Sequence, residues 1–311
     1  MKYLYGPVPS RRLGRSLGID PFEKKTCTHN CIYCQLGNGV SVSANELVER
    51  VSVDCVKDEL RRFFESDGEC DFVTFSGSGE PTLWKHTGEI VDFVRTNFPS
   101  KKIAVITNGT MLWREDVREQ ILGVDVIVPT ISAADEDTYI RLHRPNPDAS
   151  FELQIRGVEE FARIFEGEIW AEVMLVADVN DSEEHILKLR EFLRIISPTY
   201  IDINTPVRPP SERWVHPPDE EIVRKICDIL GENCRIVGKF QSISKEVFEI
   251  ANLATRILDI LRRRPETAQS IAESLSTSIE NVEQACSALV AKRLAVKVSN
   301  DFYEAKIMDN Y

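Results

Sequence analysis

Apolar, β-branched runs alternate with helical patterns along most of this chain, and that alternation limits the folds it can adopt. Six runs have the composition of buried strands: residues 16–20, 71–75, 102–107, 124–132, 168–177 and 200–204. Helical patterns with one apolar face lie between or after them, at residues 52–66, 83–97, 114–122, 135–143, 151–165, 182–196 and 218–230. Repeated strand–helix units predict a parallel sheet with helices outside it. We expect an α/β fold, a partial (β/α)6 TIM-like barrel with its site at the carboxyl ends of the strands.

The chain changes character near residue 245. Three further helices are predicted there, followed by a hairpin, at residues 246–263, 267–275, 278–294, 295–298 and 302–306. Three helices and a two-stranded wing are typical of a winged helix–turn–helix. At 311 residues the chain has room for two domains of ordinary size. We expect a barrel over residues 1–244 and a winged-helix domain over residues 245–311.

Three of the eight cysteines crowd into one short loop, as Cys27, Cys31 and Cys34. Thiolates at this spacing can wrap around one iron–sulfur cube, and three ligands leave one iron open to bind a substrate. The alternative is a zinc site with His29 as the fourth ligand. The other five cysteines are expected to be small buried hydrophobes, with a second cluster as the alternative.

The CxxxCxxC spacing, with the aromatic Tyr33 before the last cysteine, resembles the motif of the radical S-adenosylmethionine (SAM) superfamily. The resemblance covers about residues 1–240. The strand ends at 107–109 and 131–135 are similar to a subgroup that includes the archaeal tRNA wyosine-synthesis (4-demethylwyosine synthase-like) iron–sulfur oxidoreductases. The resemblance implies two cofactors, a 4Fe–4S cluster held by the three cysteines and SAM bound at the open iron.

The resemblance also assigns residues to the SAM site. The run Ser-Gly-Ser-Gly-Glu-Pro at 76–81 is similar to the family's Gly-Gly-Glu element, whose backbone groups hold the SAM ammonium. In the family, polar residues at later strand ends face the SAM ribose and carboxylate. The implied candidates are Tyr33, Gly77, Ser78, Gly79, Glu80, Asn108, Ser132 and Glu172. For Asn108 and Ser132 a turn or helix cap is the alternative, and for Glu172 a half-exposed strand position. Asp178 stands where the family has a glycine.

The implied function is an enzyme that cleaves SAM reductively to a 5′-deoxyadenosyl radical, which abstracts hydrogen from a modified tRNA base, a small metabolite or a peptide. A one-electron donor such as ferredoxin or flavodoxin is implied as a partner. The alternative is an iron–sulfur redox-sensing regulator that acts through its winged-helix domain. Glu280 and Glu283 begin the third helix of that domain and would repel phosphates, which argues against sequence-specific DNA recognition. A tRNA or protein partner remains the expected use of this domain.

The net charge of −12 argues against general binding to nucleic acid or anionic membranes. Residues 1–36 nevertheless hold six basic and two acidic residues. An anionic substrate near the cluster would explain this, and salt bridges to the acidic remainder are the alternative. The candidate substrate residues are Arg11, Arg12, Arg144 and Arg208. The N-terminus lacks the apolar core of a signal peptide and no apolar run is long enough for a bilayer, so we expect a cytoplasmic protein.

Overall fold

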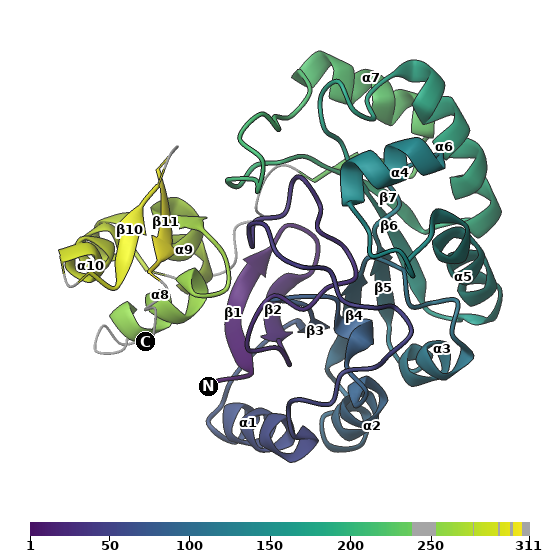
Figure 1. Ribbon diagram of the computed structural model, residues 1–311. Coiled ribbons are helices and arrows are strands. Elements are labelled where there is room, and N and C mark those ends of the chain that lie inside the picture. Colours follow the sequence, from purple (N-terminus) through teal and green to yellow (C-terminus); the bar gives the residue numbers. More distant parts are fainter. Residues whose placement is uncertain (238–252, 276, 292, 299–300, 307–311) are drawn as a thin grey trace.

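The computed structural model describes residues 1–237, 253–275, 277–291, 293–298 and 301–306. Within them, residues up to 237 form one curled sheet of eight strands with helices on its outer face (Figure 1). The strands are β1 Leu4–Ser10, β2 Gly14–Ile19, β3 Phe72–Phe75, β4 Lys102–Thr107, β5 Val126–Pro129, β6 Glu168–Met174, β7 Tyr200–Asn204 and β8 Cys234–Ile236. Their order follows the chain from β1 to β8, which leaves the sheet open. Strands β2 to β8 run parallel, and β1 pairs antiparallel with β2.

The helices confirm the predicted strand–helix alternation. They are α1 Val53–Glu65, α2 Thr87–Asn97, α3 Glu115–Ile121, α4 Glu136–His143, α5 Phe151–Ile164, α6 Glu183–Ile196 and α7 Glu220–Leu230. Helix α2 begins later than expected because Pro81–Leu83 forms a separate 3-10 turn, η1, capped by the Glu80 carboxylate. An α/β fold with a mostly parallel, partly closed sheet is therefore confirmed. The two edge strands, β1 and β8, were not predicted and add to the six predicted strands.

Local signals explain where these helices begin. The side chains of Asp135, Ser150 and Ser182 each accept a hydrogen bond from the backbone N–H three residues further on, at the starts of α4, α5 and α6. The apolar faces of the helices and the outer face of the sheet share one large core. Inside the curl a smaller cluster forms around Leu13, which the β1–β2 turn inserts there. The carboxyl ends of the strands are thus held in fixed positions.

The C-terminal segment, residues 253–306 as far as they are described, has its own core and contacts the edge of the sheet (Figure 1). Its elements are α8 Leu253–Leu261, β9 Glu266–Thr267, α9 Ala268–Leu275, α10 Ile279–Ala291, β10 Ala295–Lys297 and β11 Phe302–Ala305. The strands form a sheet in the order β10-β11-β9. Tyr5 and Val8 of β1 are buried in this second core. Residues 246–252 of the first predicted helix lie outside the described residues.

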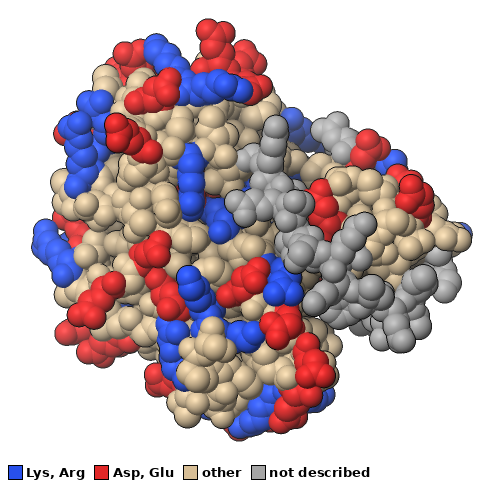
Figure 2. All heavy atoms as spheres, turned by 180° about the vertical axis from the view of Figure 1, so that it is seen from behind, with Lys and Arg blue, Asp and Glu red and all other residues tan. Residues whose placement is uncertain are grey.

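Basic and acidic side chains are interspersed on the face that Figure 2 shows, so that no continuous basic surface covers it. None of the helices in the described ranges is long and apolar enough to cross a membrane.

Candidate functional site

A cavity of about 320 Å³ lies at the carboxyl ends of the strands, as the barrel prediction expected. Its walls come from the loop after β2, the ends of β3 to β7 and the β1–β2 turn. Cys27, Cys31 and Cys34 all line it, each partly exposed and none in a disulfide. The volume lies in the range of small-molecule sites. The chain therefore brings its three closely spaced thiols to the wall of one cavity.

The cysteine loop is fixed first at its start, beside the end of β3. The Thr26 N–H donates to the Ser78 carbonyl at 2.9 Å, and the Glu80 N–H donates to the Thr26 carbonyl at 2.9 Å. Gly79 lies directly against Thr26, and a Cβ at this position would overlap the Thr26 carbonyl oxygen. Only glycine permits this approach of two backbones. Cys27, the next residue, takes its position from this contact.

The loop is fixed a second time against the end of α4. The Asn30 N–H donates to the His143 carbonyl at 2.9 Å, and the Ile32 N–H donates to the Leu142 carbonyl at 3.1 Å. These bonds flank Cys31 on both sides. The loop that carries the thiols is thus held by backbone hydrogen bonds at two places far apart in sequence, which restricts the positions of its sulfur atoms.

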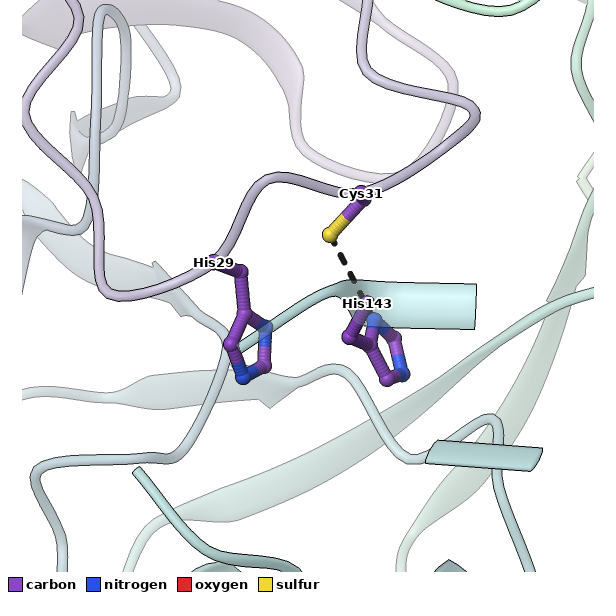
Figure 3. A group of neighbouring side chains, drawn as sticks. All are labelled: His29, Cys31 and His143. Atoms are coloured by element: carbon purple, nitrogen blue, oxygen red, sulfur yellow. Dashed lines mark hydrogen bonds between the residues drawn. The ribbon is translucent and has the colours of Figure 1, made fainter. Parts of the chain in front are cut away.

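Two buried histidines lie beside Cys31 (Figure 3). The His143 Nδ1 is 3.4 Å from the Cys31 Sγ and 3.2 Å from the Tyr33 hydroxyl. His29 stacks on His143 with ring centroids 4.8 Å apart, and its Nε2 contacts the Tyr139 hydroxyl at 2.7 Å. Burial lowers the pKa of His143 to about 3, so the ring is neutral. A neutral imidazole N–H can donate to a thiolate without adding charge.

The three thiols influence one another. Burial raises the pKa of the Cys27 thiol to about 12, and the charges of Glu80 and Cys34 raise it too. Burial also raises the pKa of Cys31 well above its ordinary value, with additions from Cys27 and Cys34. Thiolates this close repel each other, and a bound metal centre relieves that repulsion. The donor set fits a metal–sulfur centre.

Nitrogen donors are also present. In the described part of the chain, His29, Cys31 and His143 have ligand atoms within 4.8 Å of one another. The Nε2 of His29 already faces the Tyr139 hydroxyl, which itself donates to the Ala149 carbonyl at 2.8 Å. Because that hydroxyl gives its proton to Ala149, His29 Nε2 carries a hydrogen and is no ligand in this arrangement. The His29 Nδ1 then keeps its lone pair and has no hydrogen-bond partner among the described residues, so one imidazole nitrogen remains beside the three sulfur donors.

Glu80 holds the ends of β3 and β4 together. Its buried carboxylate accepts hydrogen bonds from the Thr107 hydroxyl at 2.6 Å and the Asn108 N–H at 2.6 Å. It also accepts two from Thr82, through the backbone N–H and the hydroxyl. Burial raises the pKa of Glu80, and the hydrogen bonds from these four donors lower it. Asn108 in turn extends its amide to the Thr28 hydroxyl at 2.8 Å and the Cys27 sulfur at 3.5 Å.

The cavity wall includes six of the eight residues that the sequence assigned to SAM: Tyr33, Gly77, Gly79, Glu80, Asn108 and Glu172. Ser78 and Ser132 are not on it. The Ser78 hydroxyl donates to the buried Asp20 carboxylate at 2.6 Å, and the Ser132 hydroxyl accepts from the Met174 N–H at 2.8 Å. Asp178 has φ 61°, so it adopts the left-handed conformation that a glycine would take.

The predicted substrate arginines separate into two groups. Arg11, Arg12 and Arg208 line the cavity, whereas Arg144 does not and forms an ion pair with Glu212 at 2.5 Å. Arg12 pairs with Glu172, which is buried rather than half-exposed.

Several polar lining residues were not among the predicted site residues, Lys25, Thr130 and Arg264 among them. Arg264 belongs to a basic run, residues 262–264. Position along the chain gave no signal that this run reaches the cavity.

The class of enzyme follows from three features together. These are an open, curled parallel sheet, a cavity at its strand ends and three cysteines on the cavity wall. Residues 25–190 match the family model of the radical SAM superfamily, and the chain belongs to this superfamily. Its members use a 4Fe–4S cluster and SAM, so both are cofactors of this enzyme. The three cysteines, free and facing one cavity, agree with that chemistry.

Among individual relatives, the chain is 35% identical over 289 residues to a UPF0026 protein of Methanocaldococcus jannaschii, covering 89% of this chain and 87% of that one. It is 33% identical over 293 residues to the GTPase Obg of Brachyspira hyodysenteriae, covering 93% of this chain but 42% of that protein, so it spans less than half of this relative. A solved structure of TYW1 with a lysine–pyruvate adduct bound is similar with a TM-score of 0.53 at 18% identity, covering 78% of this chain and 79% of that one. At this identity the likeness concerns the fold.

Proposed function

We propose that Cys27, Cys31 and Cys34 hold the 4Fe–4S cluster and that the enzyme cleaves SAM reductively in the cavity beside them. The observation that carries the proposal is the meeting of all three thiols and the ends of five strands at one cavity. When bound, the two cofactors supply the 5′-deoxyadenosyl radical that abstracts hydrogen from the substrate. The protein supplies position, orientation and exclusion of water.

The residues proposed to form the SAM site, either at the cavity or by fixing its walls, are Tyr33, Gly77, Ser78, Gly79, Glu80, Asn108, Ser132 and Glu172. They act in different ways. Gly77 and Gly79 let the end of β3 pack closely against neighbouring segments, since a Cβ would meet the Asp20 side chain at Gly77 and the Thr26 carbonyl at Gly79. Ser78 and Ser132 act indirectly, because their hydroxyls bond Asp20 and the Met174 N–H and so fix the ends of β3 and β5. Asn108 orients the loop through Thr28.

Glu80 is a positioning residue in this proposal. Its carboxylate accepts four hydrogen bonds from the protein and keeps the ends of β3 and β4 in register. The His143 Nδ1 contacts the Cys31 sulfur in a buried setting, and the Tyr33 hydroxyl contacts that same nitrogen. Such hydrogen bonds stabilise negative charge on a sulfur ligand and exclude water from it.

The wider setting of the enzyme follows from the same proposal. A one-electron donor such as ferredoxin or flavodoxin would reduce the cluster. The order α8, β9, α9, α10, β10, β11 with its three-stranded sheet supports a winged helix–turn–helix over residues 245–311, after a barrel over 1–244. All eight cysteines are free thiols, which supports a reducing cytoplasmic setting. The substrate classes are a modified tRNA base, a small metabolite or a peptide.

The proposal is tested by reconstituting the cluster anaerobically, adding SAM and dithionite, and measuring 5′-deoxyadenosine. We expect product from the wild type and none from Cys34→Ala, which also loses its iron. Cys55→Ala is the matched control, because Cys55 is an exposed cysteine on α1 outside the cavity lining, and it should keep full iron and full cleavage. Wild-type protein with a full cluster and no 5′-deoxyadenosine would contradict the proposal.

A further inference from the structure

One arginine of the C-terminal segment reaches into the barrel. Arg263 lies in the turn after α8, where its N–H donates to the Ile260 carbonyl at 3.0 Å. Helix α8 packs against β1, in the core that also buries Tyr5 (Figure 1). The Arg263 Nη1 donates to the Asp20 carboxylate at 2.7 Å, and its Nη2 donates to the Lys2 carbonyl. Because Asp20 directly follows β2, this contact joins the C-terminal segment to the carboxyl end of a barrel strand.

The Asp20 carboxylate in turn holds the β3 loop, residues 76–80, which follows strand β3. The Oδ2 atom that Arg263 contacts also accepts hydrogen bonds from the Ser78 N–H at 2.9 Å and the Ser78 hydroxyl at 2.6 Å. Gly77 lies so close to the Asp20 side chain that a Cβ would overlap it. One carboxylate therefore connects Arg263 to a loop of the proposed SAM site.

A second contact to the β3 loop comes from Tyr5 of β1. The Tyr5 and Ser76 hydroxyl oxygens are 2.6 Å apart. The Tyr5 ring is buried in the core of the C-terminal segment, and the Arg263 guanidinium carbon lies 5.9 Å from its centroid. Ser76 and Ser78 are thus each bonded to a side chain that the C-terminal segment contacts. These bonds fix the β3 loop on both sides of Gly77.

Arg263 also supplies charge where the arrangement needs it. Asp20 is fully buried, and burial raises the pKa of its carboxyl. Among the groups that lower the pKa of Asp20, Arg263 has the largest effect, ahead of the hydrogen bonds from Ser78. An ionised carboxylate is acceptor-only, whereas the protonated form gives up part of its acceptor capacity. Removing Arg263 therefore leaves a buried carboxylate without the charge that favours its hydrogen bonds to the β3 loop.

We propose that Arg263 is a positioning residue for SAM, and that the C-terminal segment belongs to the SAM site through it. The proposal rests on the function proposed above, which places SAM beside the β3 loop. Gly77, Gly79 and Glu80 of this loop line the cavity, whereas Arg263 and Asp20 are not among its lining residues. Arg263 thus acts on SAM through the loop rather than by contact.

Hydrogen exchange of the apo protein, followed by mass spectrometry, tests the contact without any cofactor. Arg263→Gln should speed exchange of the β3-loop amides about ten-fold or more, since the loop loses the charge-assisted support of Asp20. Arg263→Lys keeps the positive charge and should restore part of the protection. Arg262→Gln is the matched control, because this neighbouring arginine is 61% exposed and pairs with Asp259. It should exchange as the wild type does.

SAM binding is then measured by equilibrium dialysis on anaerobically reconstituted proteins compared at equal iron content. We expect Arg263→Gln to raise the Kd of SAM about ten-fold, which is the effect of losing one charge-assisted contact. Arg263→Lys should recover part of the affinity, and Arg262→Gln should match the wild type. Ser78→Ala keeps the ion pair and removes only a hydroxyl contact to Asp20. It should weaken SAM binding too, and it tests the same connection if Arg263→Gln disturbs the C-terminal segment.

Three results would overturn the proposal. They are wild-type exchange of the β3 loop in Arg263→Gln, faster exchange spread evenly over the barrel, and wild-type SAM affinity in both Arg263→Gln and Ser78→Ala. Failure of the underlying function is a separate result. A wild type that forms no 5′-deoxyadenosine contradicts that function, whereas the exchange of the apo variants does not depend on it.

Discussion

Replacing Gly79 by alanine tests how the cysteine loop is held. A Cβ at this position would overlap the Thr26 carbonyl oxygen and lie 2.7 Å from its carbonyl carbon. Both are backbone atoms, so the two segments must move apart and lose the two 2.9 Å hydrogen bonds that join them. At about 1 kcal/mol each, this loss destabilises the protein by about 2 kcal/mol. For a domain of this size, that corresponds to a fall in Tm of about 4–8 °C.

The assay compares thermal unfolding of the apo protein and iron content after anaerobic reconstitution. Cys27 follows Thr26 directly, so we expect Gly79→Ala to lower both. Gly39→Ala in the same loop is the control, because its Cβ would meet only the flexible Lys25 side chain, at 3.1 Å. A Gly79→Ala protein that has the Tm of the wild type and binds a full complement of iron would refute this role of Gly79.

Three further predictions follow from single contacts. His143→Leu removes the hydrogen bond to Cys31 and should lower the midpoint potential of the cluster by about 40 mV. This corresponds to about 1 kcal/mol for one electron. An unchanged potential in an EPR-monitored titration would count against that bond. Arg263→Ala leaves the Asp20 carboxylate, 0% exposed, without its ion-pair partner at 2.7 Å. It should cost about 3 kcal/mol in urea unfolding, and a loss no larger than that of an exposed arginine would show the pair to be unimportant. Glu80→Gln gives up at least one of four accepted hydrogen bonds and should weaken SAM binding and lower Tm; equilibrium dialysis with unchanged SAM affinity would exclude its positioning role.

The periodic part of the fold could be predicted from sequence, and the edges could not. Strand β7 matches its predicted range, and the helices that follow the strands differ from their predicted ranges by only a few residues at their ends. These elements could be predicted because alternation and capping are local signals. Strand β1 was not predicted, and it contains Pro7 and Pro9, which are rare inside a sheet. It is an edge strand with a bulge between Tyr5 and Val8, where proline is tolerated. Its other face is buried by the C-terminal segment, a contact no local pattern carries.

The site shows the same division. The motif and spacing led to Cys27, Cys31 and Cys34, which lie together at one cavity. Sequence could not tell which way a strand-end side chain points, so Ser78 and Ser132 were treated like Asn108. Neither serine lines the cavity, and their hydroxyls bond the Asp20 carboxylate and the Met174 N–H. Arg264 depends on how residues far apart in the chain pack. Long-range contacts of this kind are set by tertiary structure.

We propose that three cysteines hold a four-iron cluster and leave one iron for SAM. Mössbauer spectroscopy of protein reconstituted with 57Fe tests it most directly. We expect that adding SAM changes the signal of one iron in four and leaves the others as they were, since three irons are held by Cys27, Cys31 and Cys34. Spectra that do not respond to SAM, or a reconstituted protein without a four-iron cluster, would contradict it.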